Sequence, residues 1–327
     1  MSKNLLNLPK VYVTRKLPQF VVDILQEKCE VSVWDSESVP VPRNVLLSSA
    51  ENADGLYCLI SDQIDKDLLN HCKRLRVVST MSVGYDHVDL DALKERKIRL
   101  GYTPDVLTEA TAELTVALLL ATSRRLVEGV DLVKRGGWQS WYHDFMCGKG
   151  IQNSTLGIFG MGNIGLSIAH KLLSFHPKEI LYAGRSEKSE ASKLGAKFVG
   201  FEQLCQDSDF IVVSCALNKE TKGIFDKRAF QLMKSSAILV NSSRGPVVEQ
   251  EDLYEALSTG QIAAAGLDVC YSEPLPKDHK LLTLPNCVVL PHIGSATVET
   301  RHAMATLAAQ NLLAGLAGEN MPAEVQL

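Results

Sequence analysis

The stretch TLGIFGMGNIGLSIAHKLLSF, residues 155–175, sets the strongest limit on the fold of this 327-residue chain. It places Gly160, Gly162 and Gly165 in GxGxxG spacing, directly after an apolar run and at the start of an amphipathic segment. In such a strand–turn–helix unit the first glycine permits a tight turn, the second lets the backbone approach a pyrophosphate, and the third lets helix and strand pack closely. The stretch therefore predicts a βαβ unit that binds a dinucleotide, with a ligand-free turn as the alternative.

Short runs rich in β-branched residues recur along the chain, separated by amphipathic segments. Before residue 106 they are VYVTR, VSVWD, GLYCLI, LRVVST and IRLGYT, and from residue 156 they are LGIFG, EILYAG, AKFVG, FIVVSC, AILVNSS, AAAGLDV and CVVLPH. Such alternation is typical of parallel sheets covered by helices on both faces. We therefore expect an α/β protein with two doubly wound parallel-sheet domains, of which the second has the larger sheet.

Two helical segments suggest how the domains are connected. Residues 108–136, TEATAELTVALLLATSRRLVEGVDLVKRG, predict one long and largely buried helix that crosses between domains. After Pro291 the chain becomes helical again, and the simplest arrangement returns this last helix to the first domain. The expected domains are residues 1–106 with 299–327, and residues 107–298.

Composition excludes several classes of function. The net charge of −4 leaves no wide basic field for nucleic acid or for an anionic membrane. Eight cysteines occur singly, without metal-like clustering, so we expect no metal site, no disulfide framework and a reducing compartment. Neither a signal peptide nor an apolar run of about 18 residues is evident, and the protein is expected to be cytoplasmic, with no membrane partner.

The end of the second strand of the predicted dinucleotide fold chooses between cofactors. An acid at this point accepts hydrogen bonds from the ribose of NAD, but EILYAGRSEKS, residues 179–189, presents Arg185, Ser186 and Lys188 instead. A guanidinium fork, a hydroxyl and an ammonium suit the extra phosphate of NADP. NADPH is therefore the expected cofactor, with NADH weaker. The alternative is a solvated surface, because Glu187 and Glu190 lie alongside.

Three polar residues follow apolar runs of the second predicted sheet. Arg244 lies in NSSRGP, Glu273 in LDVCYSEP and His292 in LPHIGSAT. Each alone has an ordinary structural explanation, such as an ion pair, a cap or a solvent-facing acid. Together they indicate a site, because ligands of open α/β sheets bind outside the carboxyl ends of the strands. A nicotinamide donor needs a carbonyl acceptor, and that acceptor needs a cation and a proton source.

The chain resembles the D-2-hydroxyacid dehydrogenase family over essentially its whole length, and it is most similar to the branch that reduces glyoxylate and hydroxypyruvate. The resemblance is carried by GIFGMGNIG, VNSSRGPVV, AAAGLDVCYSEPLP, LPHIGSAT and STMSVGYDHVDL, and at the level of the branch by GYTPDVLTEATAEL, GGWQSW and AGR. It implies a Rossmann cofactor domain and a smaller, discontinuous, flavodoxin-like substrate domain. The implied activity is the reversible, NADPH-dependent reduction of hydroxypyruvate to D-glycerate and of glyoxylate to glycolate.

The resemblance also implies a role for each site residue. His292 would donate a proton to the carbonyl oxygen, Glu273 would orient His292 and favour its imidazolium, and Arg244 would hold the substrate carboxylate. Backbone amides of Val83 and Gly84 would supply a second carboxylate clamp from the first domain, for which an ordinary tight turn is the alternative. Closure of the two domains would then assemble the site. The expected cofactor contacts are Gly160, Met161, Gly162, Asn163, Ile164, Gly165, Arg185, Ser186, Lys188, Ala216, Ser242, Asp268 and Gly294.

The resemblance places a dimer-forming extension near residues 123–150, so a homodimer is expected. Its aromatic residues Trp138, Trp141, Tyr142 and Phe145 are typical of an interface, although they could instead close a local core. A further hypothesis places Trp141 near the active site of the partner. His87 has no matching role and is expected to be structural or on the surface.

Two alternative functions stay open at this point. One is a dehydrogenase for another D-2-hydroxy acid, such as D-lactate or D-glycerate 3-phosphate. The other is a nicotinamide-sensing transcriptional corepressor of the same fold, which would act as a binding module.

Overall fold

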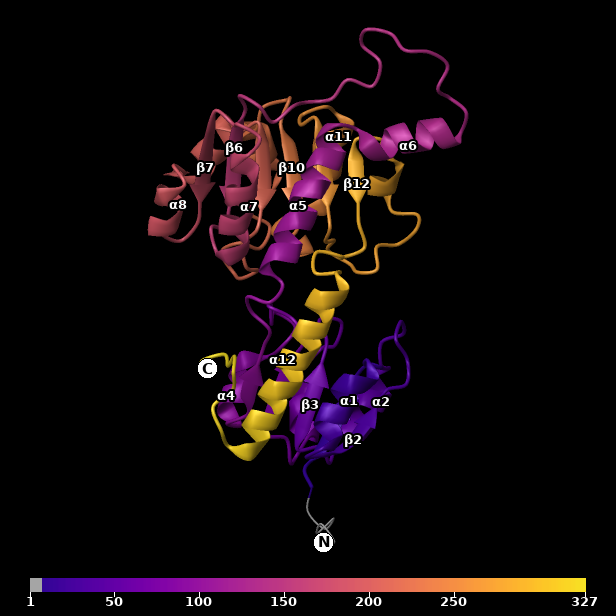
Figure 1. The fold of residues 1–327 in the computed structure, drawn as a ribbon, viewed down its shortest axis with the longest axis vertical. Helices are drawn as coiled ribbons and strands as arrows, with labels where there is room; N and C mark the ends of the chain where they lie inside the picture. The colour runs from indigo at the N-terminus through magenta and orange to yellow at the C-terminus, as the bar shows by residue number, and fades with distance from the viewer. Residues whose placement is uncertain (1–7) are drawn as a thin grey trace. The chain divides into compact units, whose positions relative to one another are not determined.

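The computed structural model describes residues 8–327, and these divide into two compact units. Unit 1 consists of the chain up to Leu107 together with Thr297–Leu327, and unit 2 consists of Thr108–Ala296. Each unit is built around one parallel sheet (Figure 1). In the described part of the chain, no helix has the length and apolar character that crossing a bilayer requires.

Unit 1 contains a five-stranded sheet in the order β2-β1-β3-β4-β5. Its strands are β1 (Lys10–Val13), β2 (Glu30–Val33), β3 (Gly55–Cys58), β4 (Val77–Thr80) and β5 (Arg99–Gly101). All four pairings are parallel, with Val13 beside Tyr57 and Cys58 beside Thr80. The central strands β3 and β4 are buried along their whole length, and neither alternates between apolar and charged residues, as expected of strands covered on both faces. This strand order is the flavodoxin-like one.

Helices cover both faces of this sheet. The helices are α1 (Gln19–Gln26), α2 (Arg43–Ala50), α3 (Lys66–His71), α4 (Leu90–Glu95) and the C-terminal α12 (Val298–Ala317). Alanine and leucine side chains of α12 pack with α1 against one face, and α2 to α4 pack against the other. The N-terminus of α12 is capped by Thr297, whose hydroxyl accepts from the Thr300 amide at 3.2 Å. The last helix therefore belongs to the first unit.

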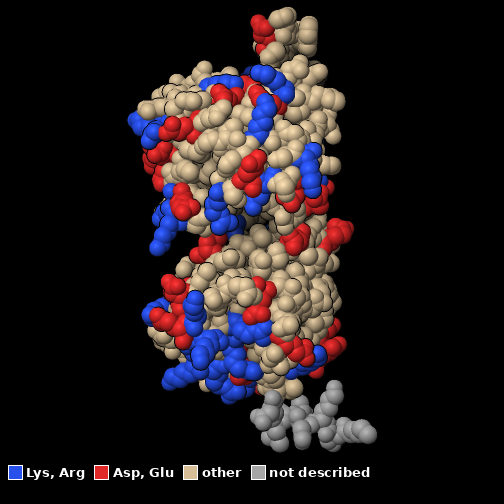
Figure 2. Space-filling model, turned by 90° about the vertical axis from the view of Figure 1, so that its left-hand side faces the viewer, with Lys and Arg blue, Asp and Glu red and all other residues tan. Residues whose placement is uncertain are grey.

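On the face drawn in Figure 2, Lys and Arg gather on one side of unit 1, with acidic side chains interspersed. Two arginines near the amino ends of β4 and β5 form ion pairs within the unit. Arg99 pairs with Glu324 of the C-terminal tail at 2.6 Å, and Arg74 pairs with Asp54 at 3.2 Å.

Unit 2 contains a seven-stranded parallel sheet in the order β12-β11-β10-β9-β6-β7-β8. Its strands are β6 (Thr155–Phe159), β7 (Glu179–Ala183), β8 (Lys197–Phe198), β9 (Phe210–Val213), β10 (Ile238–Asn241), β11 (Ala264–Leu267) and β12 (Cys287–Val289). The order reverses between β6 and β9, as in dinucleotide-binding folds. The expected pair of parallel sheets, with the second one larger, is confirmed.

Two apolar layers enclose the sheet of unit 2. One layer packs under α9 (Phe201–Asp207), α10 (Lys227–Leu232) and α11 (Gln250–Ser258). The other packs under α5 (Thr108–Ser123), α7 (Asn163–Leu173) and α8 (Ser189–Lys193). Two short 3₁₀ helices, Gly245–Val247 and Lys280–Thr283, complete the unit.

The prediction of one long buried helix over residues 108–136 is wrong. The structure has α5, which is largely buried, and a separate α6 (Leu126–Lys134), which has no buried residue. Arg125 separates them with a φ of 55°, a left-handed conformation that cannot continue a right-handed helix. The apolar positions of α6 suggested burial, but Leu126, Val130 and Val133 are each more than half exposed in the structure.

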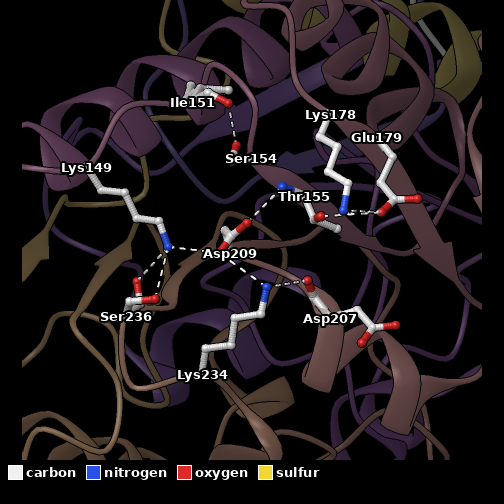
Figure 3. A network of polar contacts seen from close by, with 10 residues as sticks. All are labelled: Lys149, Ile151, Ser154, Thr155, Lys178, Glu179, Asp207, Asp209, Lys234 and Ser236. Atoms are coloured by element: carbon white, nitrogen blue, oxygen red, sulfur yellow. Dashed lines mark hydrogen bonds and ion pairs between the residues drawn. The ribbon is translucent and has the colours of Figure 1, made fainter.

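The segment that follows α6 reaches the amino end of the unit 2 sheet, where it joins the network of polar contacts drawn in Figure 3. Asp209, directly before β9, accepts hydrogen bonds from Lys149 Nζ at 3.0 Å, Lys234 Nζ at 3.2 Å and the Thr155 amide at 2.9 Å. Burial would raise the pKa of the Asp209 carboxyl, but the Thr155 amide and Lys149 hold it below its ordinary value. The carboxylate thus anchors the returning segment at the opposite end of the strands from the glycine-rich turn.

Candidate active site

The glycine-rich turn between β6 and α7 has the geometry of a phosphate cradle. Gly160 has a φ of 100°, and a Cβ there would lie 2.6 Å from the Cys215 backbone, so only glycine fits. A Cβ on Gly165 would lie 2.2 Å from the Gly160 carbonyl oxygen, which explains the close packing of α7 against the turn.

Gly162 differs from its two neighbours in the motif. A Cβ at this position would meet no protein atom within 4 Å, and its φ is −84°, so nothing within the protein requires glycine. The amides of Met161 and Gly162 have no acceptor among the described residues, and they lie at the N-terminus of the eleven-residue helix α7. An open backbone, orphan amides and a positive helix end fit a pyrophosphate. Asn163 and Ile164 form the first turn of the same helix.

The end of β7 carries the residues that distinguish the cofactors. Arg185 and Ser186 are exposed, and across residues 8–327 Arg185 makes no hydrogen bond or ion pair. The neighbouring glutamates therefore do not hold the guanidinium. The turn itself is ordered by Tyr182, whose phenol oxygen accepts from the Lys188 amide at 2.9 Å.

Arg244, Glu273 and His292 follow three adjacent strands of the unit 2 sheet. Arg244 comes three residues after β10, and the loops that carry Glu273 and His292 follow β11 and β12. The loop of Arg244 is held by Asn241, which is 1% exposed and whose side-chain amide donates to the Arg244 carbonyl at 2.9 Å. Asn241 was not predicted, although its place at the end of an apolar strand was a usable signal.

Glu273 and His292 form a hydrogen-bonded pair. Nδ1 of His292 lies 2.6 Å from Oε2 of Glu273, whose Oε1 accepts from the Cys270 amide at 3.0 Å. Burial would raise the pKa of the Glu273 carboxyl, but the hydrogen bond and charge of His292 and the Cys270 amide hold it below its ordinary value. An ionised carboxylate only accepts, so Nδ1 carries the proton in this bond. The pair leaves Nε2 of His292 for another partner.

Asp268 fixes the backbone that carries His292. It is 1% exposed, directly follows β11, and accepts from the amides of Ile293 and Gly294, both at 2.8 Å. Burial raises the pKa of this carboxyl despite the two amides. His292 itself has a φ of 56°, a left-handed conformation that costs a non-glycine residue about 1–3 kcal/mol. Asp268 and Gly294 were predicted as cofactor contacts, and in the structure the hydrogen bond between them holds the turn that carries His292.

The remaining predicted cofactor contacts lie at the same edge of the sheet. The hydroxyl of Ser242, directly after β10, lies 2.7 Å from that of Thr115 in α5. Ala216 follows β9, and its carbonyl accepts from Thr221 at 2.7 Å. Both positions belong to the carboxyl edge, at which ligands of this fold class bind.

Val83 and Gly84 lie in unit 1, in the loop after β4. Neither amide has a hydrogen-bond acceptor in the part of the chain that the structure describes, and both residues are half-buried. Two adjacent amides without acceptors can bind an anion without any side chain. The loop therefore has the chemistry expected of a carboxylate clamp.

Comparison with known proteins identifies the family. Residues 116–294 match the model of the D-isomer specific 2-hydroxyacid dehydrogenase, NAD binding domain, which lies within unit 2. The glyoxylate reductase/hydroxypyruvate reductase of Mus musculus is 55% identical over 324 residues, covering 98% of this chain and 98% of that protein. The protein of the same name from Homo sapiens is 53% identical with the same coverage.

A solved structure is similar over the same length. The NADPH-dependent glyoxylate/hydroxypyruvate reductase of Sinorhizobium meliloti, in complex with NADP and malonate, has a TM-score of 0.85 at 29% identity and covers 98% of this chain and 97% of its own. The family model, which spans more than half of the chain, and the two mammalian relatives together show that this chain belongs to the D-isomer specific 2-hydroxyacid dehydrogenase family.

Proposed function

We propose that the protein is an NADPH-preferring reductase of hydroxypyruvate and glyoxylate. The observation that carries the proposal is the Glu273–His292 pair, in which Nδ1 of His292 lies 2.6 Å from Oε2 of Glu273. These two residues follow β11 and β12, which lie beside β10, the strand that Arg244 follows. The mammalian relatives named for the same two substrates support the choice of substrate. The cofactor, when bound, supplies the hydride that reaches the carbonyl carbon.

The protein's own residues supply the rest of the reaction. His292 donates its Nε2 proton to the carbonyl oxygen, so that hydride and proton together convert the 2-oxo acid into a 2-hydroxy acid. Glu273 holds Nδ1 and stabilises the imidazolium that reduction requires. Arg244 binds the substrate carboxylate and polarises the carbonyl, and the amides of Val83 and Gly84 bind the same carboxylate.

Preference for NADPH follows from the end of β7. Arg185 has no acidic partner among residues 8–327 and can turn its donor fork to a 2′-phosphate, while Ser186 adds a hydroxyl and Lys188 a charge. No acid occupies the position from which a ribose hydroxyl is usually bound. The Sinorhizobium meliloti enzyme, named NADPH-dependent, is a relative that supports this preference.

Replacing Arg185 with Asp is expected to raise the Michaelis constant for NADPH at least tenfold, about 1.4 kcal/mol, and to raise that for NADH less. The loss of absorbance at 340 nm is followed with NADPH and NADH, each with hydroxypyruvate, glyoxylate and pyruvate. Replacing Arg228, an exposed arginine paired with Glu202, by Asp is the matched control. Equal constants for NADPH in wild type and Arg185→Asp would refute the cofactor assignment.

The same assay separates the alternatives for the wild-type protein. Faster turnover of pyruvate than of hydroxypyruvate would favour a dehydrogenase of another D-2-hydroxy acid. No oxidation of either cofactor with any acid would favour a binding module such as the corepressor.

We further propose a homodimer formed through α6 and the segment that follows it. Leu126, Val130 and Val133 recur at helical spacing on α6, and all three are more than half exposed. They border a hollow of about 540 Å³ that Met146 also lines. Trp138, Trp141 and Tyr142 are exposed in the next residues, and Trp141 is 81% exposed. A continuous apolar stripe beside large aromatic residues has the composition of an interface core, and a second copy offers the same stripe.

The dimer predicts that Val130→Asp lowers the molar mass in light scattering to that of one chain, because the change buries a charge in the interface. The cost to the folding of one chain is small, since Val130 is 52% exposed in it. Val39→Asp is the control, because Val39 is 55% exposed and lies outside the stripe. A wild-type protein that is already monomeric at the same concentration would contradict the proposal.

A further inference from the structure

A chain of three buried polar side chains lies behind the loop of Val83 and Gly84. Nε2 of His87 lies 3.0 Å from Oγ1 of Thr80, which lies 2.8 Å from Oγ of Ser82. Oγ of Ser82 donates to the carbonyl oxygen of Gly84 at 2.7 Å. His87, Thr80 and Ser82 are 8%, 0% and 4% exposed, so the chain is nearly closed to solvent.

The direction of every hydrogen bond in this chain follows from its last member. A carbonyl oxygen only accepts, so the single hydroxyl proton of Ser82 goes to Gly84. Ser82 must then accept a hydrogen bond from Thr80, and this bond uses the single hydroxyl proton of Thr80. Thr80 can only accept from His87, and His87 must therefore carry a proton on Nε2. The ordered chain thus runs from His87 through Thr80 and Ser82 to the loop.

The chain bears on the orientation of the loop amides because peptide planes are rigid. The carbonyl of Ser82 accepts from the Thr103 amide at 2.8 Å, which turns the Val83 N–H to the opposite side. The carbonyl of Gly84 is held by Ser82 Oγ, which fixes the next peptide plane. The two planes that flank the Val83–Gly84 peptide are therefore both held from within unit 1. The other end of the loop is tied by the Ile64 amide, which donates to the His87 carbonyl at 2.9 Å.

We propose that His87, with Thr80 and Ser82, is a positioning residue that presents the Val83 and Gly84 amides to the substrate carboxylate. This inference rests on the proposed function, which uses these amides as a clamp. Donors that are fixed before the substrate arrives bind it without reorganising, and a loop that had to be ordered on binding would bind more weakly. His87 touches neither substrate nor cofactor in this role, and it acts through Thr80 and Ser82.

The test replaces Ser82 with Ala and measures steady-state constants for hydroxypyruvate and glyoxylate with NADPH. KM for both acids is expected to rise about tenfold, with kcat within about twofold and the dissociation constant of NADPH unchanged, because the cofactor cradle lies in unit 2. Ser208→Ala is the matched control, since Ser208 is 0% exposed and its hydroxyl has no partner in the described structure. KM of this control is expected to equal that of wild type.

Variants of His87 separate positioning from a general loss of stability. His87→Leu is expected to raise KM severalfold, and His87→Gln, whose Nε2 can donate to Thr80, to restore KM to within about twofold of wild type. In the Ser82→Ala background, His87→Leu is expected to raise KM little further, because the hydrogen-bond chain is already interrupted at Ser82. If Ser82→Ala fails to fold, Thr80→Val breaks the same chain with an isosteric side chain.

Two outcomes count against different claims. A wild-type protein that reduces neither acid would overturn the proposed function. An active wild type with unchanged KM in Ser82→Ala, or with His87→Gln as impaired as His87→Leu, would overturn the role of the chain and leave the proposed function standing.

Discussion

Replacing His292 with Ala is expected to lower kcat for hydroxypyruvate by about 10²- to 10⁴-fold, which is the usual contribution of a general acid. His292 is the imidazole that Glu273 holds through Nδ1, and without it the oxygen that accumulates charge during reduction has no positioned proton donor. Binding of NADPH, followed by its fluorescence, is expected to stay within about twofold, since the glycine-rich turn is unaffected.

The control for His292→Ala must account for backbone conformation. His292 has a φ of 56°, and His176, an exposed residue of the same unit, has a φ of 52°. His176→Ala thus makes the same side-chain change at a comparable backbone position outside the site, and it is expected to keep wild-type kcat. Wild-type turnover in His292→Ala would mean that another group donates the proton.

The features that the sequence could predict are those that depend on local patterns. Buried parallel strands read as apolar runs, so the two sheets and the larger size of the second were accessible from the printed sequence. The residues that directly follow such runs lie together at the carboxyl edge of the parallel sheet. Arg244, Glu273 and His292 could for this reason be assigned to one edge from the sequence alone, and their roles stay predictions.

The features that the sequence could not predict depend on contacts between distant segments. The break between α5 and α6 depends on a single left-handed residue, Arg125, at a position where no glycine or asparagine marks the end of a helix. The apolar stripe of α6 then suggested burial within the chain, since periodicity cannot say which molecule covers a helix face. His87 was expected to be structural or on the surface. Its link to the Gly84 carbonyl could not be predicted, because it passes through two hydroxyls whose rotamers only the fold determines.

Replacing Arg244 with Met is expected to lower kcat/KM for hydroxypyruvate by about 10²- to 10³-fold, the usual cost of removing one electrostatic donor from a preorganised site. In the proposal the guanidinium both binds the carboxylate and polarises the carbonyl, so KM is expected to rise and kcat to fall. Arg244→Lys tests whether charge alone suffices: an ammonium keeps the charge but loses the planar fork, and its kcat/KM is expected to lie between Met and wild type. Arg228→Met removes an exposed, ion-paired arginine of the same unit and should leave kcat/KM unchanged. If Arg244→Met raised KM alone, with kcat intact, the residue would bind substrate and transition state equally, and polarisation of the carbonyl would have to come from His292.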